Sequence, residues 1–306
     1  MKHIFIVNPA AGKSDRTAEY RKMIEAAFAP RGLSYELLVS GAPGECRTLA
    51  RQAAQSGEEV RLYACGGDGT ANEVANGILG FDNAAMTMVP VGTGNDLLKN
   101  FGDDLEKFRD VENLWDGPVF PMDVIEVNGR YALTIACSGI DARVAADVHK
   151  YSESPLLDGK SSYIVSLLVN FFFKGIGSHW KVEMDGEEME GDWSLVSVCN
   201  GRYYGGGFMP VPDAMPDDGV LDVLAVGEIS RLTFFRLVGK YAQGLYRQYP
   251  QLITDWHGQS LSFSSPREIT VVVDGEVMRG TRFTVRLSPL KINFFFPAGA
   301  DYSPEF

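Results

Sequence analysis

The feature that most constrains this fold is a repeated unit in the first third of the chain. Three short apolar runs each end at a polar stretch that contains proline or glycine, and they are Ile4–Val7, Val60–Cys65 and Met86–Val89. Segments with the apolar spacing of helices lie between them. Strands that alternate with helices predict a parallel sheet covered by helices on both faces, and such sheets bind ligands at the C-terminal ends of their strands.

The remaining elements of this region follow from the same pattern. Ser14 or Asp15 can cap a helix that runs to about Phe28. Further along, Leu33–Val39 is a predicted strand. Two more helices are expected, and they are Glu45–Gln55 and Thr70–Leu79.

The pattern of apolar and polar residues changes at about Asp123, where alternation with a period of two residues and turn signals begin. Asn128-Gly129, Asp185-Gly186 and Asp274-Gly275 each separate β-like stretches, which is the strongest short-range signal for a hairpin. We therefore predict an α/β domain over residues 1–122 and a β-rich domain over residues 123–289. The continuous apolar run 290–296 predicts that the C-terminal segment 290–306 returns to the first domain.

Bulk properties exclude several classes of protein. A length of 306 residues favours two domains. A net charge of −12 argues against nucleic-acid binding, which requires a positive face, and against a polybasic membrane anchor. No signal peptide and no run of about 20 apolar residues is present, so we expect a cytoplasmic protein with at most peripheral contact at the inner membrane surface. The four cysteines form no CxxC pair and are expected to be buried and reduced.

Three glycine-containing stretches follow the three apolar runs, and all are expected at one sheet edge. They are Asn8-Pro9-Ala10-Ala11-Gly12-Lys13, Gly66-Gly67-Asp68-Gly69-Thr70 and Pro90-Val91-Gly92-Thr93-Gly94-Asn95-Asp96. Glycine lets backbone N–H groups approach a phosphate without an intervening Cβ, and each stretch leads into a helix N-terminus. One such stretch alone is ordinary turn chemistry. Three together predict a site for a phosphate chain.

Neither familiar phosphate motif fits these stretches. No Gly-Lys-Ser/Thr closes a Walker loop, and Leu97 stands where a dinucleotide fingerprint needs glycine or alanine. The set instead resembles the signature of the diacylglycerol kinase catalytic family, which includes bacterial soluble lipid kinases and sphingosine kinases and is distantly related to NAD kinases. The resemblance continues through Asp123, Asn200-Gly201 and Asp274-Gly275-Glu276, and thus covers nearly the whole chain.

The resemblance implies that ATP binds in a cleft between the two domains and that its γ-phosphate passes to a lipid hydroxyl. The nucleotide-binding residues that it implies are Asn8, Pro9, Ala10, Ala11, Gly12, Lys13, Ser40, Gly66, Gly67, Asp68, Gly69, Thr70, Asn72, Glu73, Gly92, Thr93, Gly94 and Asn95.

The resemblance also implies Mg²⁺. Asp68 can hold the ion directly or through water, with Asp96 and Asp123 joining a carboxylate–water–metal network. Helix capping is the alternative role of Asp96, and an ordinary strand-edge acid that of Asp123. A second, structural magnesium site would use the Asp218 carboxylate with the carbonyls of Met215 and Val220, although a Pro-Asp-Asp-Gly turn needs no ion.

Asp274 and Glu276 are the candidates for the general base. Local chemistry does not distinguish their turn from Asp185-Gly186-Glu187, which repeats the same tripeptide between similar strands. In the family that the chain resembles, the later Asp-Gly-Glu supplies the base. The sequence leaves open which of the two acids accepts the proton, and Asp68 completes the predicted catalytic set.

The lipid acceptor is less constrained. Tyr163–Phe173 could line an acyl groove or touch the bilayer, but an apolar helix is more often core, and Tyr203–Met209 is a second candidate lip. Diacylglycerol is the acceptor most common in the family, and the expected membrane contact is transient and peripheral.

A homodimer is compatible with the sequence. Phosphorylation of NAD and a non-catalytic nucleotide-binding regulator are the alternative functions, and the four histidines are expected to have surface or packing roles.

Overall fold

A computed structural model describes residues 1–306 except 13, 91–94, 141, 144–176, 185 and 303–306. The chain divides into two compact units. The first comprises Met1–Val124, Pro216–Asp218 and Ser288–Phe306, and the second comprises Ile125–Met215 and Gly219–Leu287. The boundaries expected from the sequence were 122/123 and 289/290. The predicted helix Tyr163–Phe173 lies outside the described residues.

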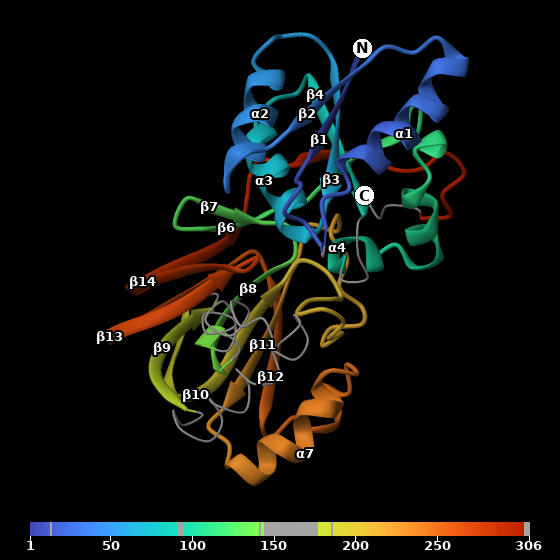
Figure 1. The fold of residues 1–306 in the computed structure, drawn as a ribbon. Helices are drawn as coiled ribbons and strands as arrows, with labels where there is room; N and C mark the ends of the chain where they lie inside the picture. Colours follow the sequence, from blue (N-terminus) through green and yellow to red (C-terminus); the bar gives the residue numbers. More distant parts are fainter. Residues whose placement is uncertain (13, 91–94, 141, 144–176, 185, 303–306) are drawn as a thin grey trace. The chain divides into compact units, whose positions relative to one another are not determined.

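The first unit is built on a six-stranded sheet in the order β2-β1-β3-β4-β15-β5 (Figure 1). Its strands are β1 (Lys2–Val7), β2 (Tyr35–Val39), β3 (Val60–Gly66), β4 (Ala84–Pro90), β5 (Val119–Met122) and β15 (Ile292–Phe295). All neighbours pair in parallel except β15 and β5. The C-terminal strand β15 lies between β4 and β5, and therefore belongs to this sheet.

Helices cover both faces of this sheet (Figure 1). The described helices of the unit are α1 (Thr17–Phe28), α2 (Glu45–Ala54), α3 (Asp68–Ile78) and the short α4 (Asp96–Lys99), with 3₁₀ segments at Ala29–Arg31, Gly102–Arg109 and Val111–Asn113. Strand β1 is buried from its second residue on, as expected where both faces are covered. Phe28 of α1 packs edge-on against Phe5 and Tyr63.

Helices α2 and α3 approach each other closely at Gly77. A Cβ at this position would lie 2.6 Å from the carbonyl oxygen of Arg47, so only glycine permits this contact. Helix α1 begins at Thr17, later than the sequence indicated, with Arg16 as its N-cap. The carboxylate of Asp15 accepts a bond from the Thr17 N–H at 2.8 Å, which is an Asx-type turn before the helix rather than the predicted cap.

The second unit is built on a nine-stranded antiparallel sheet. Its strands are β6 (Ile125–Val127), β7 (Arg130–Ala132), β8 (Ile135–Gly139), β9 (Ser178–Met184), β10 (Glu187–Cys199), β11 (Leu221–Gly227), β12 (Ile253–Gly258), β13 (Ser260–Val273) and β14 (Glu276–Leu287). Their order is β12-β11-β10-β8-β13-β14-β6-β7, and β9 pairs with both β10 and β13. Apolar residues of one sheet face form one core, which includes Val196 and Val271.

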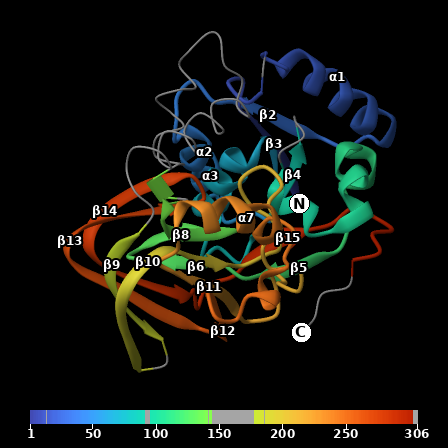
Figure 2. The ribbon, with the colours of Figure 1, turned by 90° about the horizontal axis from the view of Figure 1, so that it is seen from below.

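Helix α7 (Arg231–Tyr241) covers part of the opposite sheet face (Figure 2). Leu237 and Tyr241 pack there in a second core with residues of β8, β10 and β11 such as Cys137 and Leu195. A 3₁₀ turn, Tyr246–Gln248, follows the helix. The predicted fold class, an α/β unit joined to a β-rich unit, is confirmed.

The hairpin turns follow their sequence signals. Asn128 and Gly129 between β6 and β7 have φ values of 47° and 82°, and Asp274 and Gly275 between β13 and β14 have 45° and 90°. Positive φ at both central residues is the type I′ geometry that Asn-Gly and Asp-Gly favour. The Asp274 turn thereby places Glu276 at the first position of β14.

Candidate active site

The ends of β2, β1, β3 and β4 lie at a single edge of the first sheet. Val7 pairs with Val39 on one side and with Cys65 on the other, and Gly66 pairs with Pro90. Ser40 adds a backbone hydrogen bond of 2.9 Å to the carbonyl of Val7. Because the strands run parallel, the polar residues that follow them all leave the sheet at this edge.

Asn8 links the first of these stretches to the second. Its amide donates a 3.1 Å hydrogen bond to the Thr70 hydroxyl, and its Oδ1 accepts one of 3.0 Å from the Ala10 N–H. The chain then turns through Gly12, whose φ is +87°. The sequence-predicted residues Lys13, Gly92, Thr93 and Gly94 lie outside the described residues, and Asn95, which follows them, is buried with a φ of 44°.

The glycines around β3 have two different environments. A Cβ on Gly66 would lie 2.3 Å from the Thr70 hydroxyl oxygen, so Gly66 lets helix α3 start close to the strand. A Cβ on Gly67 or Gly69 would meet nothing within 4 Å. Open space therefore lies beside the start of α3, which has no side-chain cap. A helix N-terminus with backbone N–H groups beside open space is suited to hold a phosphate.

Asp68 joins the second stretch to the third. Its carboxylate accepts hydrogen bonds from the backbone N–H groups of Asp96, at 3.0 Å, and Leu97, at 3.2 Å. These bonds fix the orientation of the carboxylate and cap the short helix α4. The capping acid is thus Asp68, whereas Asp96 itself forms an ion pair of 2.6 Å with Lys99.

Two other predicted residues have structural partners. Both carboxylate oxygens of Glu73 accept backbone N–H bonds at the start of α2, from Gly44 at 3.0 Å and Cys46 at 3.1 Å. Asn72 accepts from the amide of Asn76, one turn along α3. Both residues support the helices that frame the sheet edge.

Asp123 is fully buried and lies 2.8 Å from the ammonium group of Lys291. Its backbone N–H donates to the carbonyl of Pro216 at 2.7 Å, which attaches the segment Pro216–Asp218 to the first unit. Within the described ranges, no three His, Cys, Asp or Glu side chains form a cluster that could hold a metal ion. The set of Asp68, Asp96 and Asp123 is therefore not a preformed metal cage.

The ligands predicted for a second magnesium ion belong to different units. Asp218 lies in the segment that joins the first unit, whereas Met215 and Val220 belong to the second. Beside them, Asp217 accepts a hydrogen bond of 3.0 Å from the Tyr302 hydroxyl. This second site stays a prediction.

The two candidate bases of the second unit differ sharply. Both Asp274 oxygens accept hydrogen bonds, from the backbone N–H groups of Leu133, Thr134 and Ile135 and from the Thr134 hydroxyl. Glu276 is 73% exposed and forms an ion pair of 3.8 Å with Arg130. Asp274 thus anchors the turn, while Glu276 is accessible to a substrate.

Thr134 and Asn200 help to hold the Asp274 turn in place. The buried Asn200 donates its amide to the carbonyl of Leu133 at 3.0 Å, and its backbone N–H donates to the carbonyl of Thr134 at 2.9 Å. Sequence reasoning singled out Asn200 through the family resemblance and missed Thr134. No local motif marks Thr134, because its partner Asp274 lies 140 residues away.

The loop Tyr203–Met209 is anchored rather than loose. Tyr204 and Phe208 exchange backbone hydrogen bonds of 3.0 and 2.9 Å, and the Met209 N–H donates to Ala242 just after α7. Left-handed φ values at Gly205, Gly206 and Gly207 make this tight turn possible.

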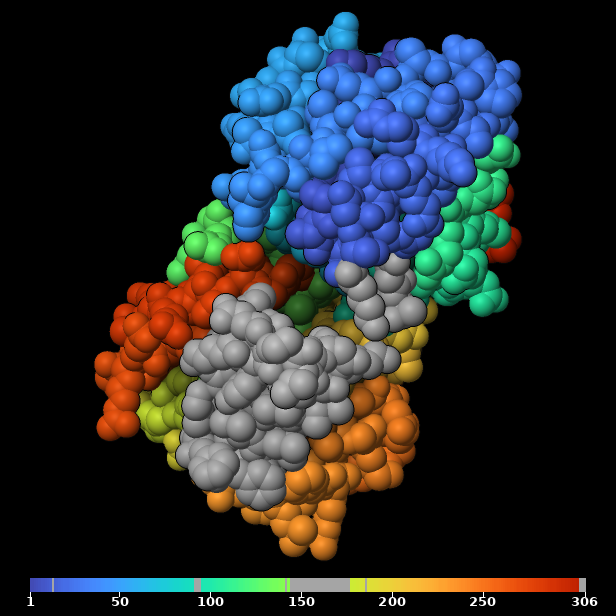
Figure 3. Space-filling view, in the orientation of Figure 1, coloured from blue at the N-terminus to red at the C-terminus, as the bar shows by residue number. Residues whose placement is uncertain are grey.

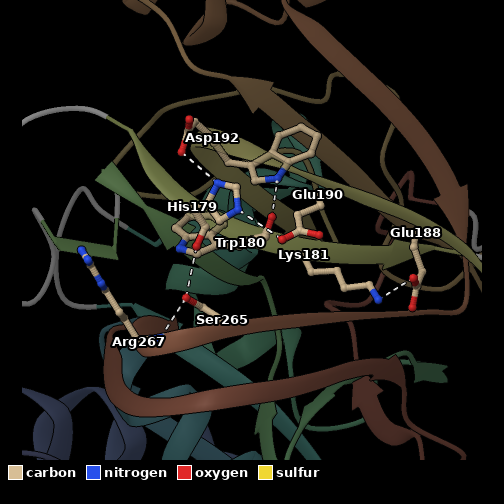
Figure 4. A network of polar contacts seen from close by, with 9 residues as sticks. His179, Trp180, Lys181, Glu188, Glu190, Asp192, Ser265 and Arg267 are labelled. Atoms are coloured by element: carbon tan, nitrogen blue, oxygen red, sulfur yellow. Dashed lines mark hydrogen bonds and ion pairs between the residues drawn. The ribbon is translucent and has the colours of Figure 1, made fainter.

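A separate polar network lies at the surface of β9 and β10 (Figure 4). The ring of His179 lies between Asp192 and Glu190, and hydrogen bonds to these carboxylates raise the pKa of the imidazole. The network borders a hollow of about 630 Å³ that Arg143, Arg267, Glu228 and Glu268 also line. Charges of both signs share this hollow, so its chemistry does not select a ligand.

His3 and the four cysteines lie in the interior of the protein. His3 is buried against Phe28 and Tyr63, which is a packing role, and His149 lies outside the described residues. All four cysteines are buried thiols that form no disulfide, as predicted, and burial raises the pKa of the Cys46 and Cys65 thiols. In the described part of the chain no helix has both the length and the apolar character needed to cross a bilayer.

Comparison with known proteins gives a consistent result over nearly the whole chain. A protein of Pseudomonas aeruginosa described as a probable lipid kinase YegS-like is 28% identical over 292 residues, which are 94% of this chain and 93% of that protein. A protein of Pseudomonas fluorescens with the same description is 27% identical over 295 residues, 92% of each chain. The crystal structure of a diacylglycerol kinase from Bacillus anthracis superposes with a TM-score of 0.70 at 22% identity over 98% of both chains, and so shares the fold.

Family models match both parts of the chain. The diacylglycerol kinase catalytic domain matches residues 2–127. The YegS C-terminal NAD kinase beta sandwich-like domain matches residues 134–296, which is more than half of the sequence. Together with the glycines that follow β1 and β3 at one sheet edge and the anchored Asp-Gly-Glu turn, these matches establish that the chain belongs to the diacylglycerol kinase catalytic family.

Proposed function

We propose that this protein is a kinase that transfers the γ-phosphate of ATP to a lipid hydroxyl, with diacylglycerol as the acceptor and phosphatidic acid as the product. The observation that carries the proposal is the meeting of four strand ends at one sheet edge, where α3 starts without a side-chain cap beside open space at Gly67 and Gly69. The names of the relatives support a lipid as the acceptor.

The glycines and the polar side chains at this edge have different roles in the proposed reaction. Backbone N–H groups around Gly12 and Gly67 hold the phosphates of ATP, and the dipole of α3 adds to their attraction. Asn8 and Thr70 keep the first two stretches in register through their 3.1 Å hydrogen bond. Positioning of this kind supplies most of the catalysis in phosphoryl transfer.

The acidic residues of the first unit fit a magnesium ion unequally. Asp96 and Asp123 each have a lysine partner within 2.8 Å, which offsets the negative charge that would attract a cation. Asp68, oriented by two backbone N–H bonds, would hold Mg²⁺ directly or through water, and the ion would neutralise charge on the phosphates.

Glu276 is the proposed general base. It accepts the proton of the lipid hydroxyl as the oxygen attacks the γ-phosphorus, and the leaving group is ADP. Its exposure leaves it accessible, whereas Asp274 is already engaged in four hydrogen bonds and acts as a positioning residue.

An assay with purified protein and ATP labelled in the γ-phosphate tests this proposal. The acceptors are diacylglycerol, a sphingoid base, phosphatidylglycerol, a polyprenol and NAD, each offered separately in the presence of Mg²⁺. Label in diacylglycerol supports the proposal in full. Label in another lipid supports the lipid kinase activity and replaces diacylglycerol as the acceptor. Label in NAD alone, or ATP binding without transfer to any acceptor, contradicts it.

A further inference from the structure

Helix α7 has an outward face that carries both apolar and cationic side chains. Its exposed positions recur in adjacent pairs, and they are Arg231, Leu232, Phe235, Arg236, Gly239 and Lys240. Leu232 is 60% exposed and Phe235 is 54% exposed, one helical turn apart. The other exposed large apolar residues of the described chain are Met1, Val39, Val119 and Leu290, which are far apart in the sequence.

The inward face of α7 packs on the sheet and explains why the helix forms, whereas Leu232 and Phe235 stay largely exposed to solvent. Phe234, Leu237 and Tyr241 pack over the sheet around an apolar gap of about 40 Å³. A gap of that size holds roughly one water-sized group. Leu232 and Phe235 lie on the exposed side of the helix. Residues of α7 form part of the orange surface at the lower end of Figure 3.

The net charge of α7 is positive, whereas the net charge of the whole chain is negative. The helix carries Arg231, Arg236 and Lys240 and no acidic residue, although the chain has a net charge of −12. Among the described residues none of these three cations forms an ion pair, whereas Arg247, shortly after the helix, pairs with Asp213 at 2.7 Å. Exposed leucine and phenylalanine flanked by arginine and lysine are typical of helices that lie in the interface of an anionic bilayer.

We propose that α7 docks the protein on an anionic membrane surface. Leu232 and Phe235 insert between the lipid headgroups, and Arg231, Arg236 and Lys240 contact headgroup phosphates. The inference rests on the proposed function, because a lipid hydroxyl must be reached in the bilayer that holds it. It assigns the membrane contact to a segment that the sequence did not single out.

Vesicle flotation with the full-length protein tests this inference. The vesicles are phosphatidylcholine alone and phosphatidylcholine with about 30% phosphatidylglycerol, which gives the vesicle surface a negative potential. We expect the wild type to float with the anionic vesicles and the double variant Leu232→Ser/Phe235→Ser to bind about tenfold more weakly. The triple variant Arg231→Gln/Arg236→Gln/Lys240→Gln should lose the preference for anionic vesicles and the sensitivity to salt.

The matched control is Val119→Ser, which replaces an apolar residue of 41% exposure on β5 and should float like the wild type. Circular dichroism confirms that each variant is folded. Equal flotation of the wild type and the double variant overturns the inference, and so does absence of binding by the wild type. A concentration-dependent dimer that the double variant abolishes, without vesicle binding, would identify α7 as a self-association surface and also overturn it.

Two acceptor presentations separate this inference from the proposed function. Dioctanoylglycerol dispersed without vesicles reports the kinase reaction alone, and a long-chain diacylglycerol in vesicles requires docking as well. Phosphorylation of the dispersed lipid without vesicle binding contradicts the docking role of α7 and supports the kinase activity. Vesicle binding through α7 without phosphorylation of any acceptor contradicts the kinase activity and supports the docking role.

Discussion

The hydroxyl of Thr134 donates a hydrogen bond of 2.6 Å to Oδ1 of Asp274. The backbone N–H groups of residues 133–135 donate to the same carboxylate, and the Asp274 N–H donates to the carbonyl of Ile135. The β13–β14 turn is therefore fastened to the start of β8. Because Glu276 begins β14 directly after this turn, its position depends on the carboxylate of Asp274.

We expect Asp274→Asn to destabilise the protein by about 2 kcal/mol, because an amide N–H₂ would face backbone donors and leave at least one of them unsatisfied. Asparagine tolerates the left-handed backbone of this position, so the effect comes from the lost acceptor. Urea denaturation measures the change. Asp185→Asn, in the first Asp-Gly-Glu tripeptide, is the sequence-matched control, and equal stability of the two variants would contradict the anchoring role.

Glu276→Gln should lower kcat on the lipid acceptor by roughly 10²- to 10⁴-fold, the usual contribution of a general base. Its stability should stay within about 0.5 kcal/mol of the wild type, because the side chain is 73% exposed. Glu187→Gln is the control, since Glu187 has the same place in the first tripeptide and starts β10. A Glu276→Gln enzyme with wild-type kcat would exclude this residue as the base.

Adjacent glycines at the end of β3 allow folding and nucleotide binding to be tested separately. In Gly66→Ala the new Cβ meets the Thr70 hydroxyl at 2.3 Å, so we expect a loss of stability of about 1–3 kcal/mol. In Gly67→Ala the Cβ enters open space, so stability should be unchanged while the KM for ATP rises. Thermal unfolding and ATP titration of the two variants, compared in parallel, check both expectations, and equal KM values for Gly67→Ala and the wild type would argue against phosphate binding here.

Periodicity and turn chemistry predicted much of the fold. The apolar runs of the first unit became β1, β3 and β4, and the three Gly-containing dipeptides fell between paired strands. These features are local, since a strand or a type I′ turn depends on a few neighbouring residues. The late start of α1 was missed because the carboxylate of Asp15 bonds two residues ahead instead of capping the helix.

Long-range partners could not be predicted from the sequence. Local sequence does not distinguish Asp274 from Glu276, and the Thr134 hydroxyl that bonds the Asp274 carboxylate lies 140 residues away in the chain. Similarly, the motif acid Glu73 proved to hold the start of α2, and Asp123 proved to be paired with Lys291. Pairings of this kind depend on how separate elements pack, which no local pattern encodes.

A buried histidine should make stability fall in mild acid. His3 is 3% exposed, with its Nδ1 2.8 Å from the Tyr63 hydroxyl, and burial, aided by the charge of Arg61, lowers its pKa from 6.5 to about 4. Between these two values the unfolded chain binds a proton that the folded protein does not. The folded state therefore loses stability as the pH falls from about 6.5 towards 4, and this contribution is constant above 6.5.

His3→Asn removes the titrating group and keeps a polar partner for Tyr63. Every other group titrates alike in both proteins, so the difference in their free energies of unfolding isolates His3. We expect that difference to shift in favour of the variant by about 2 kcal/mol between pH 8 and pH 5, measured by urea denaturation. A difference that stays the same at both pH values would mean that His3 accepts its proton equally well in the folded protein.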